Sequence, residues 1–283
     1  MNNATLHQGI SNCQAVAAQH YENFPVASWL LPKQHRLPIT VIYAFARSAD
    51  DIADELTIPA KERIAVLDEF EQSLSDALAA RPAPELFHAV RFIIQKYELP
   101  ERYFFDLLSA FKQDTQQTRY HHYSDVIDYC QRSANPVGRL LLHIFNHTDD
   151  KYLNWSDNIC TALQIINFLQ DYEQDYSENN RIYFPQDELL KFEISEDDWS
   201  SRANDSKKKA FFNFQITRTR QLLKNGEKLG KVLPGRMGLE IRTIIHSGFA
   251  VLTKLENSKH TYDRPRLNIF EKIPILIKAI LNV

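Results

Sequence analysis

Cysteine and glycine are scarce in this sequence, which contains three Cys and seven Gly among 283 residues. Cys13, Cys130 and Cys160 lie far apart and form no CxxC pair, so neither a disulfide framework nor a zinc site is indicated. A reducing compartment fits this use of cysteine, and we expect a cytoplasmic protein. Leu, Ala, Glu, Lys and Gln fill long stretches that strand-forming residues would otherwise occupy, which favours helices.

Several other features are absent. The formal net charge is −3 and no Lys and Arg tract dominates, so we expect no nucleic-acid partner. No stretch approaches eighteen uninterrupted apolar residues, and the first thirteen residues lack the basic start and apolar run of a secretory signal. We therefore expect a protein that is neither exported nor membrane-spanning. No GxGxxG loop is present, which argues against a built-in reductive step that uses NADPH.

Helical periodicity runs through most of the chain, and no regular β pattern competes with it. The prolines Pro25, Pro32 and Pro38 predict a bent connection before a helix that begins at Ile39. Further helices are predicted at residues 59–80, 86–97, 102–115, 123–147, 154–175, 207–229 and 236–255. Pro136 should kink the 123–147 helix, and the polar stretch 193–209 is interpreted as an exposed loop. One all-α domain, residues 1–283, is the simplest organisation.

Two of these helices carry acidic side chains four residues apart. At about 100° per residue, each pair lies in a narrow polar stripe of an otherwise apolar helix. The first stripe consists of Tyr43, Arg47, Asp50 and Asp54. The second consists of Gln164, Asn167, Asp171 and Asp175. A single DxxxD spacing is more often a solvated helix face, but a second cluster, followed by Arg-Ile-Tyr-Phe-Pro at 181–185, is less easily dismissed.

The chemistry of the paired carboxylates indicates magnesium. Carboxylates four residues apart repel each other when both are ionised, so two such pairs in apolar surroundings call for cations or solvent. Mg²⁺ takes oxygen ligands, keeps several waters and commonly bridges a few carboxylates to substrate phosphates. The sequence therefore predicts a Mg²⁺ site that binds a phosphorylated substrate.

These residues resemble the squalene and phytoene synthase family, whose paired signatures match residues 43–54 and 164–185. The resemblance covers almost the whole chain. It implies a single-domain, all-α isoprenoid synthase (terpenoid synthase) helical bundle around a central cavity. It also implies that Asp50 and Asp54 face Asp171 and Asp175 across that cavity, with magnesium binding the substrate diphosphate between them.

The same resemblance assigns roles to further residues, position by position. It implies catalytic, cavity-lining roles for Tyr43, Arg47, Tyr129, Asn135, Asn167 and Tyr183. It implies substrate or diphosphate binding by His20, Asn23, Phe24, Arg47, Gln164, Arg181 and Arg264. Aromatics at helical spacing are more often core residues than catalytic ones, and a solvated basic turn is an equal alternative for Arg264.

Within the family, residues 20–28 and 133–139 look most like bacterial hydroxysqualene synthases of hopanoid pathways, which narrows the substrate to presqualene diphosphate. Members that join two prenyl diphosphates usually carry lysine and serine where this chain has Glu22 and Asn23, and arginine where it has Gln170. The loss of basic groups suits a site that receives one diphosphate, because each further anion needs cationic partners.

The expected reaction is loss of diphosphate, assisted by magnesium with Arg181 and Arg264, to leave a cyclopropylcarbinyl cation. The cation rearranges and is captured by water, held by Asn135 or Asn167, to give hydroxysqualene. One alternative is a synthase that condenses two prenyl diphosphates to presqualene diphosphate, squalene or phytoene. A non-catalytic assembly factor is another, although such relatives tend to lose their aspartates and all four persist here.

The final segment, residues 269–283, is largely apolar. We expect it to pack on the protein core, with contact with a membrane surface as the alternative. In that alternative the protein lies peripherally on the inner face of the cytoplasmic membrane. Enzymes upstream and downstream in the same pathway are the other candidate partners.

Overall fold

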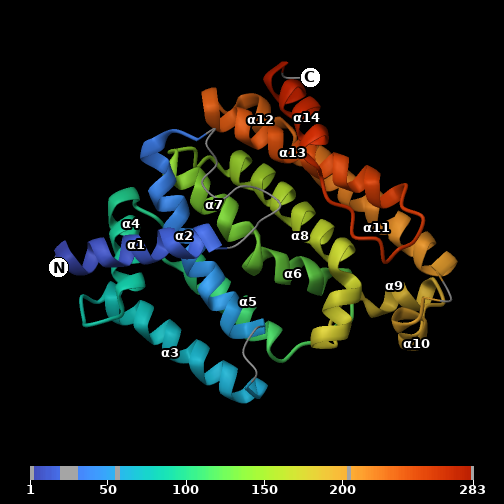
Figure 1. The fold of residues 1–283 in the computed structure, drawn as a ribbon, viewed down its shortest axis with the longest axis horizontal. Helices are drawn as coiled ribbons and strands as arrows, with labels where there is room; N and C mark the ends of the chain where they lie inside the picture. Colours follow the sequence, from blue (N-terminus) through green and yellow to red (C-terminus); the bar gives the residue numbers. More distant parts are fainter. Residues whose placement is uncertain (1–2, 20–30, 55–57, 203–204, 282–283) are drawn as a thin grey trace. The chain divides into compact units, whose positions relative to one another are not determined.

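A computed structural model describes residues 3–19, 31–54, 58–202 and 205–281, most of which are helical (Figure 1). They form two compact units, each described by itself. Unit 1 contains Met1–Gln116 and Pro136–Asp149, and unit 2 contains Gln117–Asn135 and Asp150–Val283. The predicted helical class is confirmed, whereas the single domain over 1–283 stays a prediction.

Unit 1 is organised around one central helix, α2. Its helices are α1 (Asn3–Gln19), α2 (Lys33–Asp54), α3 (Ala60–Leu78), α4 (Glu85–Tyr97), α5 (Arg102–Asp114) and most of α7 (Asn135–Ile144). Helix α2 contacts α1, α3, α4 and α5 (Figure 1). Its fully buried Phe45 lies 5.2 Å from Phe104 and 5.4 Å from Phe70 between ring centroids. This apolar packing fixes the helix that carries the first aspartate pair.

Unit 2 is built on the long helix α8. Its helices are α6 (Tyr123–Ser133), α8 (Asp150–Asn179), α9 (Gln186–Lys191), α10 (Glu196–Ser200), α11 (Asp205–Gly226), α12 (Lys228–Val232), α13 (Gly235–Glu256) and α14 (Ile269–Leu281). Helices α8, α11 and α13 pack against one another (Figure 1). A Cβ atom on Gly226 would lie 2.6 Å from the Trp155 carbonyl oxygen, so glycine permits the close approach of α11 to α8.

A short parallel strand pair, which the sequence did not predict, lies in unit 2. Strand β1 (Arg119–Tyr120) pairs with β2 (Ile182–Pro185), with an irregular register between its two residues. The Ile182 N–H donates to the Thr118 carbonyl at 2.9 Å. Two to four residues are too few for an alternating pattern to be visible, and all four residues of β2 are buried.

Three predicted boundaries were wrong. Helix α2 begins at Lys33, and Pro38 lies inside it. Proline removes the hydrogen bond to the carbonyl four residues earlier, but the Tyr97 hydroxyl donates to that Gln34 carbonyl at 3.1 Å and compensates for the loss.

The predicted helix 123–147 is two helices, α6 and α7, separated at Ala134. The predicted loop 193–209 contains α10 and the start of α11. Ser195 and Asp198 form a reciprocal capping box at the beginning of α10, a sequence signal that the loop prediction overlooked.

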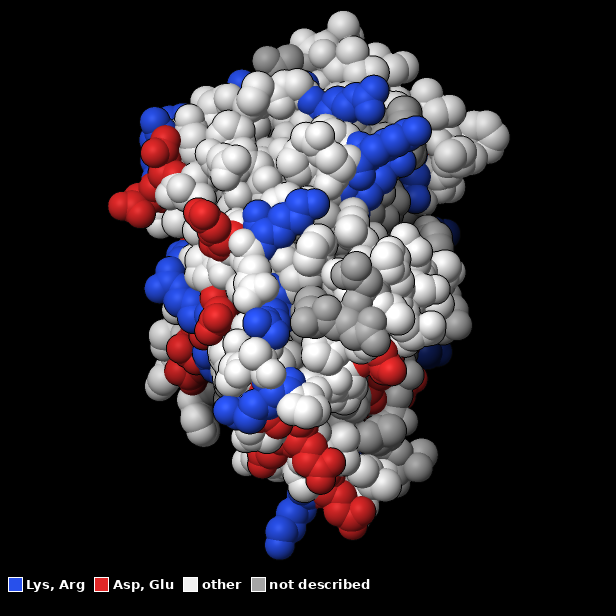
Figure 2. All heavy atoms as spheres, turned by 90° about the vertical axis from the view of Figure 1, so that its left-hand side faces the viewer, with Lys and Arg blue, Asp and Glu red and all other residues white. Residues whose placement is uncertain are grey.

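The surface carries charges of both signs. On the face drawn in Figure 2, Lys and Arg side chains are interspersed with Asp and Glu side chains and with uncharged residues. This face therefore presents no field of a single sign. In the part of the chain that the structure describes, no helix has both the length and the hydropathy needed to cross a membrane.

Candidate active site

The first aspartate pair lies on the last turns of α2. Asp50 and Asp54 are both half-buried there. Arg47 Nη1 lies 3.2 Å from Asp50 Oδ2, and Arg47 Nε lies 2.6 Å from Asp51 Oδ1. The guanidinium is therefore shared between Asp50 and a neighbouring carboxylate outside the predicted stripe. Arg47 compensates only part of the negative charge at this end of α2.

Asp50 holds its proton unusually tightly. Burial raises the pKa of its carboxyl to about 7, with Asp54 adding to the rise and Arg47 opposing it. Asp114, at the end of α5, and Asp51 raise that pKa further. An added cation beside Asp50 would favour its ionised form and so oppose the effects of burial and of Asp54.

Asp114 is a candidate site residue that the sequence reasoning missed. Its side chain is buried, at 6% exposure, and it interacts electrostatically with Asp50. A signal existed, because Asp114 follows the buried Leu107 and Phe111 at seven- and three-residue spacing and thus stands on the apolar face of α5. A carboxylate on a buried helix face needs a compensating group.

The second aspartate pair lies on α8 in unit 2. Asp171 Oδ1 forms an ion pair with Arg264 Nε, and Arg264 Nη1 donates to Gln174 Oε1 at 2.9 Å. Burial raises the pKa of Asp171, while Arg264 and Arg266 oppose the rise. The structure thus places the exposed Arg264 in an ion pair with Asp171, and its role in binding diphosphate stays a prediction.

The segment that carries Arg264 is held along α8 by further contacts. Gln170 Nε2 donates to the Pro265 carbonyl at 2.7 Å, and the Tyr172 and Thr261 hydroxyls lie 3.1 Å apart. Gln170 is buried, at 7% exposure. Gln170, which stands where condensing synthases usually carry arginine, therefore positions the segment that brings Arg264 to Asp171.

Unit 2 also contains an aromatic cluster. Tyr129 on α6 and Tyr183 on β2 have ring centroids 5.4 Å apart, and the Tyr183 ring stacks on Phe168 of α8 at 3.9 Å. Tyr120 on β1 stacks on Tyr183 at 5.7 Å. Arg181 Nη1 donates to the Tyr183 hydroxyl at 2.8 Å. Phe168 and Tyr120 were not predicted, because each is an ordinary apolar position in its element.

The other predicted residues lie in several places. Asn135, buried at the start of α7, accepts a hydrogen bond from the Thr161 hydroxyl at 3.0 Å. Gln164 is half-buried and Asn167 exposed on α8, and Tyr43 is half-buried on α2. The remaining three, His20, Asn23 and Phe24, lie outside the described residues.

The donor groups fit magnesium. Among the described residues, no group of three or more His, Cys, Asp or Glu side chains would hold a metal ion by itself. Carboxylates instead occur as pairs, and burial together with the neighbouring Asp54 raises the pKa of Asp50 despite the nearby Arg47. Mg²⁺ commonly takes one or two carboxylates and completes its coordination with water and substrate phosphates. A pair of aspartates on one helix provides these one or two carboxylate ligands.

Comparison with known proteins shows which family the chain resembles. Residues 17–271 match the squalene/phytoene synthase family. The hydroxysqualene synthase of Sinorhizobium fredii is 32% identical over 269 residues, which are 94% of this chain and 90% of that protein. The hydroxysqualene synthase of Rhodopseudomonas palustris is 33% identical over 251 residues, 88% of this chain and 85% of that protein.

Solved structures agree with the sequence matches. The crystal structure of squalene synthase HpnC from Alicyclobacillus acidocaldarius superimposes with a TM-score of 0.83 at 32% identity, covering 91% of this chain and 96% of that chain. The fold prediction is thereby confirmed at the level of the family. With its family match over residues 17–271 and relatives similar over most of its length, this chain belongs to the squalene/phytoene synthase family.

Proposed function

We propose that this protein is a hydroxysqualene synthase, which converts presqualene diphosphate and water into hydroxysqualene and diphosphate. The observation that carries the proposal is the pair of aspartate helices, together with an arginine held on Asp171. The two bacterial relatives described above, both named hydroxysqualene synthase, support the choice of reaction. The proposal includes cytoplasmic action and contact with enzymes before and after it in the pathway.

The four aspartates serve the diphosphate in this proposal. Asp50 and Asp54 provide carboxylate oxygens from α2, and Asp171 and Asp175 provide them from α8. When bound, Mg²⁺ supplies positive charge that stabilises the departing diphosphate. Arg264, which already lies at Asp171, adds a guanidinium suited to phosphate oxygens.

The aromatic cluster in unit 2 suits the cationic stage of the reaction. The C–O bond to diphosphate breaks with its electron pair on oxygen, and a cyclopropylcarbinyl cation remains. In this proposal the ring of Tyr129, which packs on the stacked Tyr183 and Phe168 rings, stabilises such a cation, while the packing of the cluster excludes bulk water. The hydrogen bond from Arg181 fixes the orientation of the Tyr183 ring.

Water capture completes the reaction. The water oxygen bonds to the rearranged cation and loses a proton. Asn167, which is exposed on α8, is a better candidate to hold this water than Asn135, whose Oδ1 already accepts a hydrogen bond from Thr161.

A condensing reaction is the second candidate, because the similar structure from Alicyclobacillus acidocaldarius carries the name squalene synthase. The contact between Gln170 and the Pro265 carbonyl favours the first candidate. An amide at this position holds the backbone without adding a cation for a second diphosphate.

Product identification tests the proposal. Purified protein is incubated with presqualene diphosphate and Mg²⁺, without a nicotinamide cofactor, in ¹⁸O-labelled water, and the extract is examined by mass spectrometry. We expect hydroxysqualene that carries one labelled oxygen, and loss of product in Asp171→Asn. Efficient coupling of farnesyl diphosphate alone would support the condensing reaction instead. If the protein shows no turnover and no magnesium-dependent binding of diphosphate, it is a non-catalytic member of the family.

A further inference from the structure

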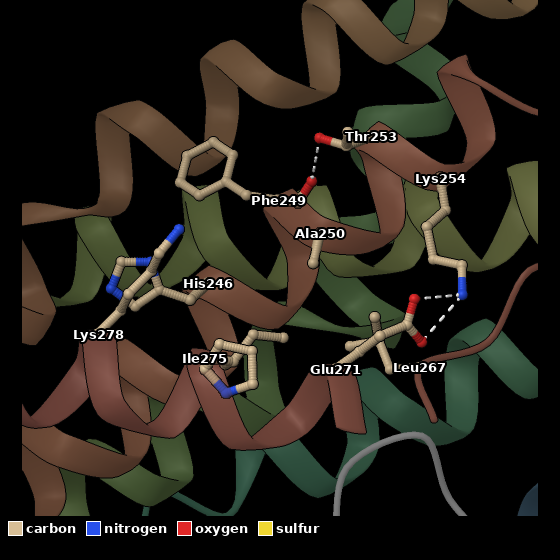
Figure 3. A pocket seen from close by; sticks show the side chains of 10 residues that line it. His246, Phe249, Ala250, Thr253, Lys254, Leu267, Glu271, Ile275 and Lys278 are labelled. Atoms are coloured by element: carbon tan, nitrogen blue, oxygen red, sulfur yellow. Dashed lines mark hydrogen bonds and ion pairs between the residues drawn. The ribbon is translucent and has the colours of Figure 1, made fainter. Parts of the chain in front are cut away.

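Helix α14 has one face that belongs to the protein core. Ile275 and Ala279 are buried against α13. Arg242 Nε donates to the Ala279 carbonyl at 2.6 Å. Lys254 Nζ lies 2.7 Å from Glu271 Oε1 (Figure 3). These contacts hold α14 along α13, so the predicted packing of this segment on the core is present in unit 2.

The opposite face of α14 is apolar and exposed. Its exposed large side chains are Ile269 (65%), Phe270 (79%), Ile273 (53%), Ile277 (51%), Ile280 (59%) and Leu281 (65%). At about 100° per residue, they fall with Pro274 and Leu276 in one arc of roughly 160° that contains no charged side chain. We call these six exposed side chains the α14 face. An apolar surface of this kind usually marks a binding site.

Lysines stand at both edges of the α14 face. On the same helical projection, Lys272 borders one side of the arc and Lys278 the other. The acidic residue of α14, Glu271, is paired with Lys254, so its charge is compensated. Lys231 on the neighbouring α12 is paired with Glu227 at 2.6 Å, so the charge at the edges comes from Lys272 and Lys278. The edges of the face are therefore basic.

A hollow under α14 reinforces this arrangement. A cavity of about 380 Å³ lies between α13 and α14, and Lys278 and His246 line it together (Figure 3). Burial lowers the pKa of His246, the positive charge of Lys278 lowers it further, and the negative charge of Glu227 opposes the shift. Lys278 thus supplies positive charge beside the apolar face, where an anionic group would be attracted.

We propose that the α14 face binds the surface of a lipid bilayer that contains anionic lipids, with its isoleucine, leucine and phenylalanine side chains among the acyl chains. Lys272 and Lys278 then reach headgroup phosphates from the edges of the face. A helix of 13 residues is about 20 Å long and lies in the interface plane rather than across a hydrocarbon layer of about 30 Å.

Composition favours lipid over a protein partner. Cores of protein interfaces are enriched in aromatic residues, Met and Arg and depleted in Lys. The α14 face has aliphatic side chains and one phenylalanine, with lysine at its edges, which is the pattern of an interfacial membrane helix. The surface stands independently of the reaction. Membrane binding would give the protein access to long isoprenoid chains dissolved in the bilayer, and this use of the surface rests on the proposed function.

Vesicle flotation tests the proposal with the full chain. Protein is mixed with vesicles of phosphatidylcholine alone, or of phosphatidylcholine with phosphatidylglycerol, and floated through a density gradient. We expect wild-type protein to float with the anionic vesicles, and more weakly with the neutral ones. The double variant Phe270→Ser/Ile277→Ser should bind about tenfold or more weakly, because two exposed apolar side chains no longer enter the bilayer.

Two further variants make the test specific. Leu190→Ser changes another exposed apolar side chain, at 74% exposure on α9, and should float like wild type. Lys272→Gln/Lys278→Gln should remove most of the preference for anionic vesicles. Circular dichroism and thermal unfolding check that each variant is folded.

Three results would overturn the proposal. Wild-type protein that stays out of both vesicle fractions is one, and equal flotation of the Phe270→Ser/Ile277→Ser variant is another. Light scattering that shows a wild-type dimer, made monomeric by the same double variant, would mean that a second copy covers the face. None of these results depends on turnover, so they are distinguishable from failure of the proposed function.

Discussion

Replacing Asp50 by asparagine should stabilise the metal-free protein above pH 7. Burial, with help from Asp54, raises the pKa of Asp50 from 3.8 to about 7. The folded protein therefore keeps this proton up to about pH 7, whereas the unfolded chain releases it near pH 4. Between these values the free energy of unfolding falls as pH rises, and the loss is complete above pH 7. Asparagine does not ionise, so the variant avoids this loss.

The magnitude follows from the size of the shift. About three pKa units correspond to about 4 kcal/mol. The side chain of Asp50 is 36% exposed, so solvent screening reduces this figure, and we expect a gain of about 2 kcal/mol. The difference between Asp50→Asn and wild type should vanish near pH 4, where both side chains are neutral.

Urea unfolding at a series of pH values measures this difference, with EDTA present. Asp76→Asn is the matched control in the same unit, because hydrogen bonds from Arg81 and Gln72 lower the pKa of Asp76 and its ionised form stabilises the fold. This control should lose stability at pH 8, not gain it. Added Mg²⁺ should stabilise wild type at pH 8 but not Asp50→Asn. A difference between Asp50→Asn and wild type that does not change with pH would refute the reasoning.

Three other perturbations have defined outcomes. Arg264→Gln should weaken diphosphate binding about tenfold or more by isothermal titration, because it loses the charged hydrogen bonds, while Arg266→Gln should have a smaller effect; equal effects would contradict the role of Arg264. Gly226→Ala should destabilise the protein by about 1–3 kcal/mol in urea unfolding, since its methyl group would meet the Trp155 carbonyl, and unchanged stability would contradict that close contact. Removing Mg²⁺ with EDTA should abolish the rise in Tm that diphosphate causes in wild type, and Asp171→Asn should lack the rise even with Mg²⁺; a rise that persists in EDTA would argue against metal-assisted binding.

The sequence predicted features that depend on local periodicity. The stripes on α2 and α8 were recognised because the 3.6-residue repeat of a helix fixes which side chains share a face. The break between two helices at Ala134 was predicted as a kink within one helix, because the helical periodicity continues across it. Pro38 was taken as a helix boundary because the compensating hydroxyl, Tyr97, is distant in sequence.

Parts of the candidate site that depend on distant contacts were beyond sequence reasoning. The position of Arg264 results from Gln170 binding the Pro265 carbonyl, 95 residues away, and from the Tyr172–Thr261 contact, 89 residues apart. No periodicity links these residues. Asp114 was recognisable only as an acid on a buried face, and its link to Asp50 required the packing of α5 on α2.

A crystal structure of the protein with Mn²⁺ in place of Mg²⁺, and with diphosphate, tests the central claim most directly. Anomalous scattering locates each metal ion without reference to its ligands. The account predicts metal ions bound by carboxylate oxygens of Asp50 or Asp54 and of Asp171 or Asp175, with the diphosphate attached to the ions of both pairs. Aspartates that point into solvent without metal, or ions bound elsewhere, would contradict it.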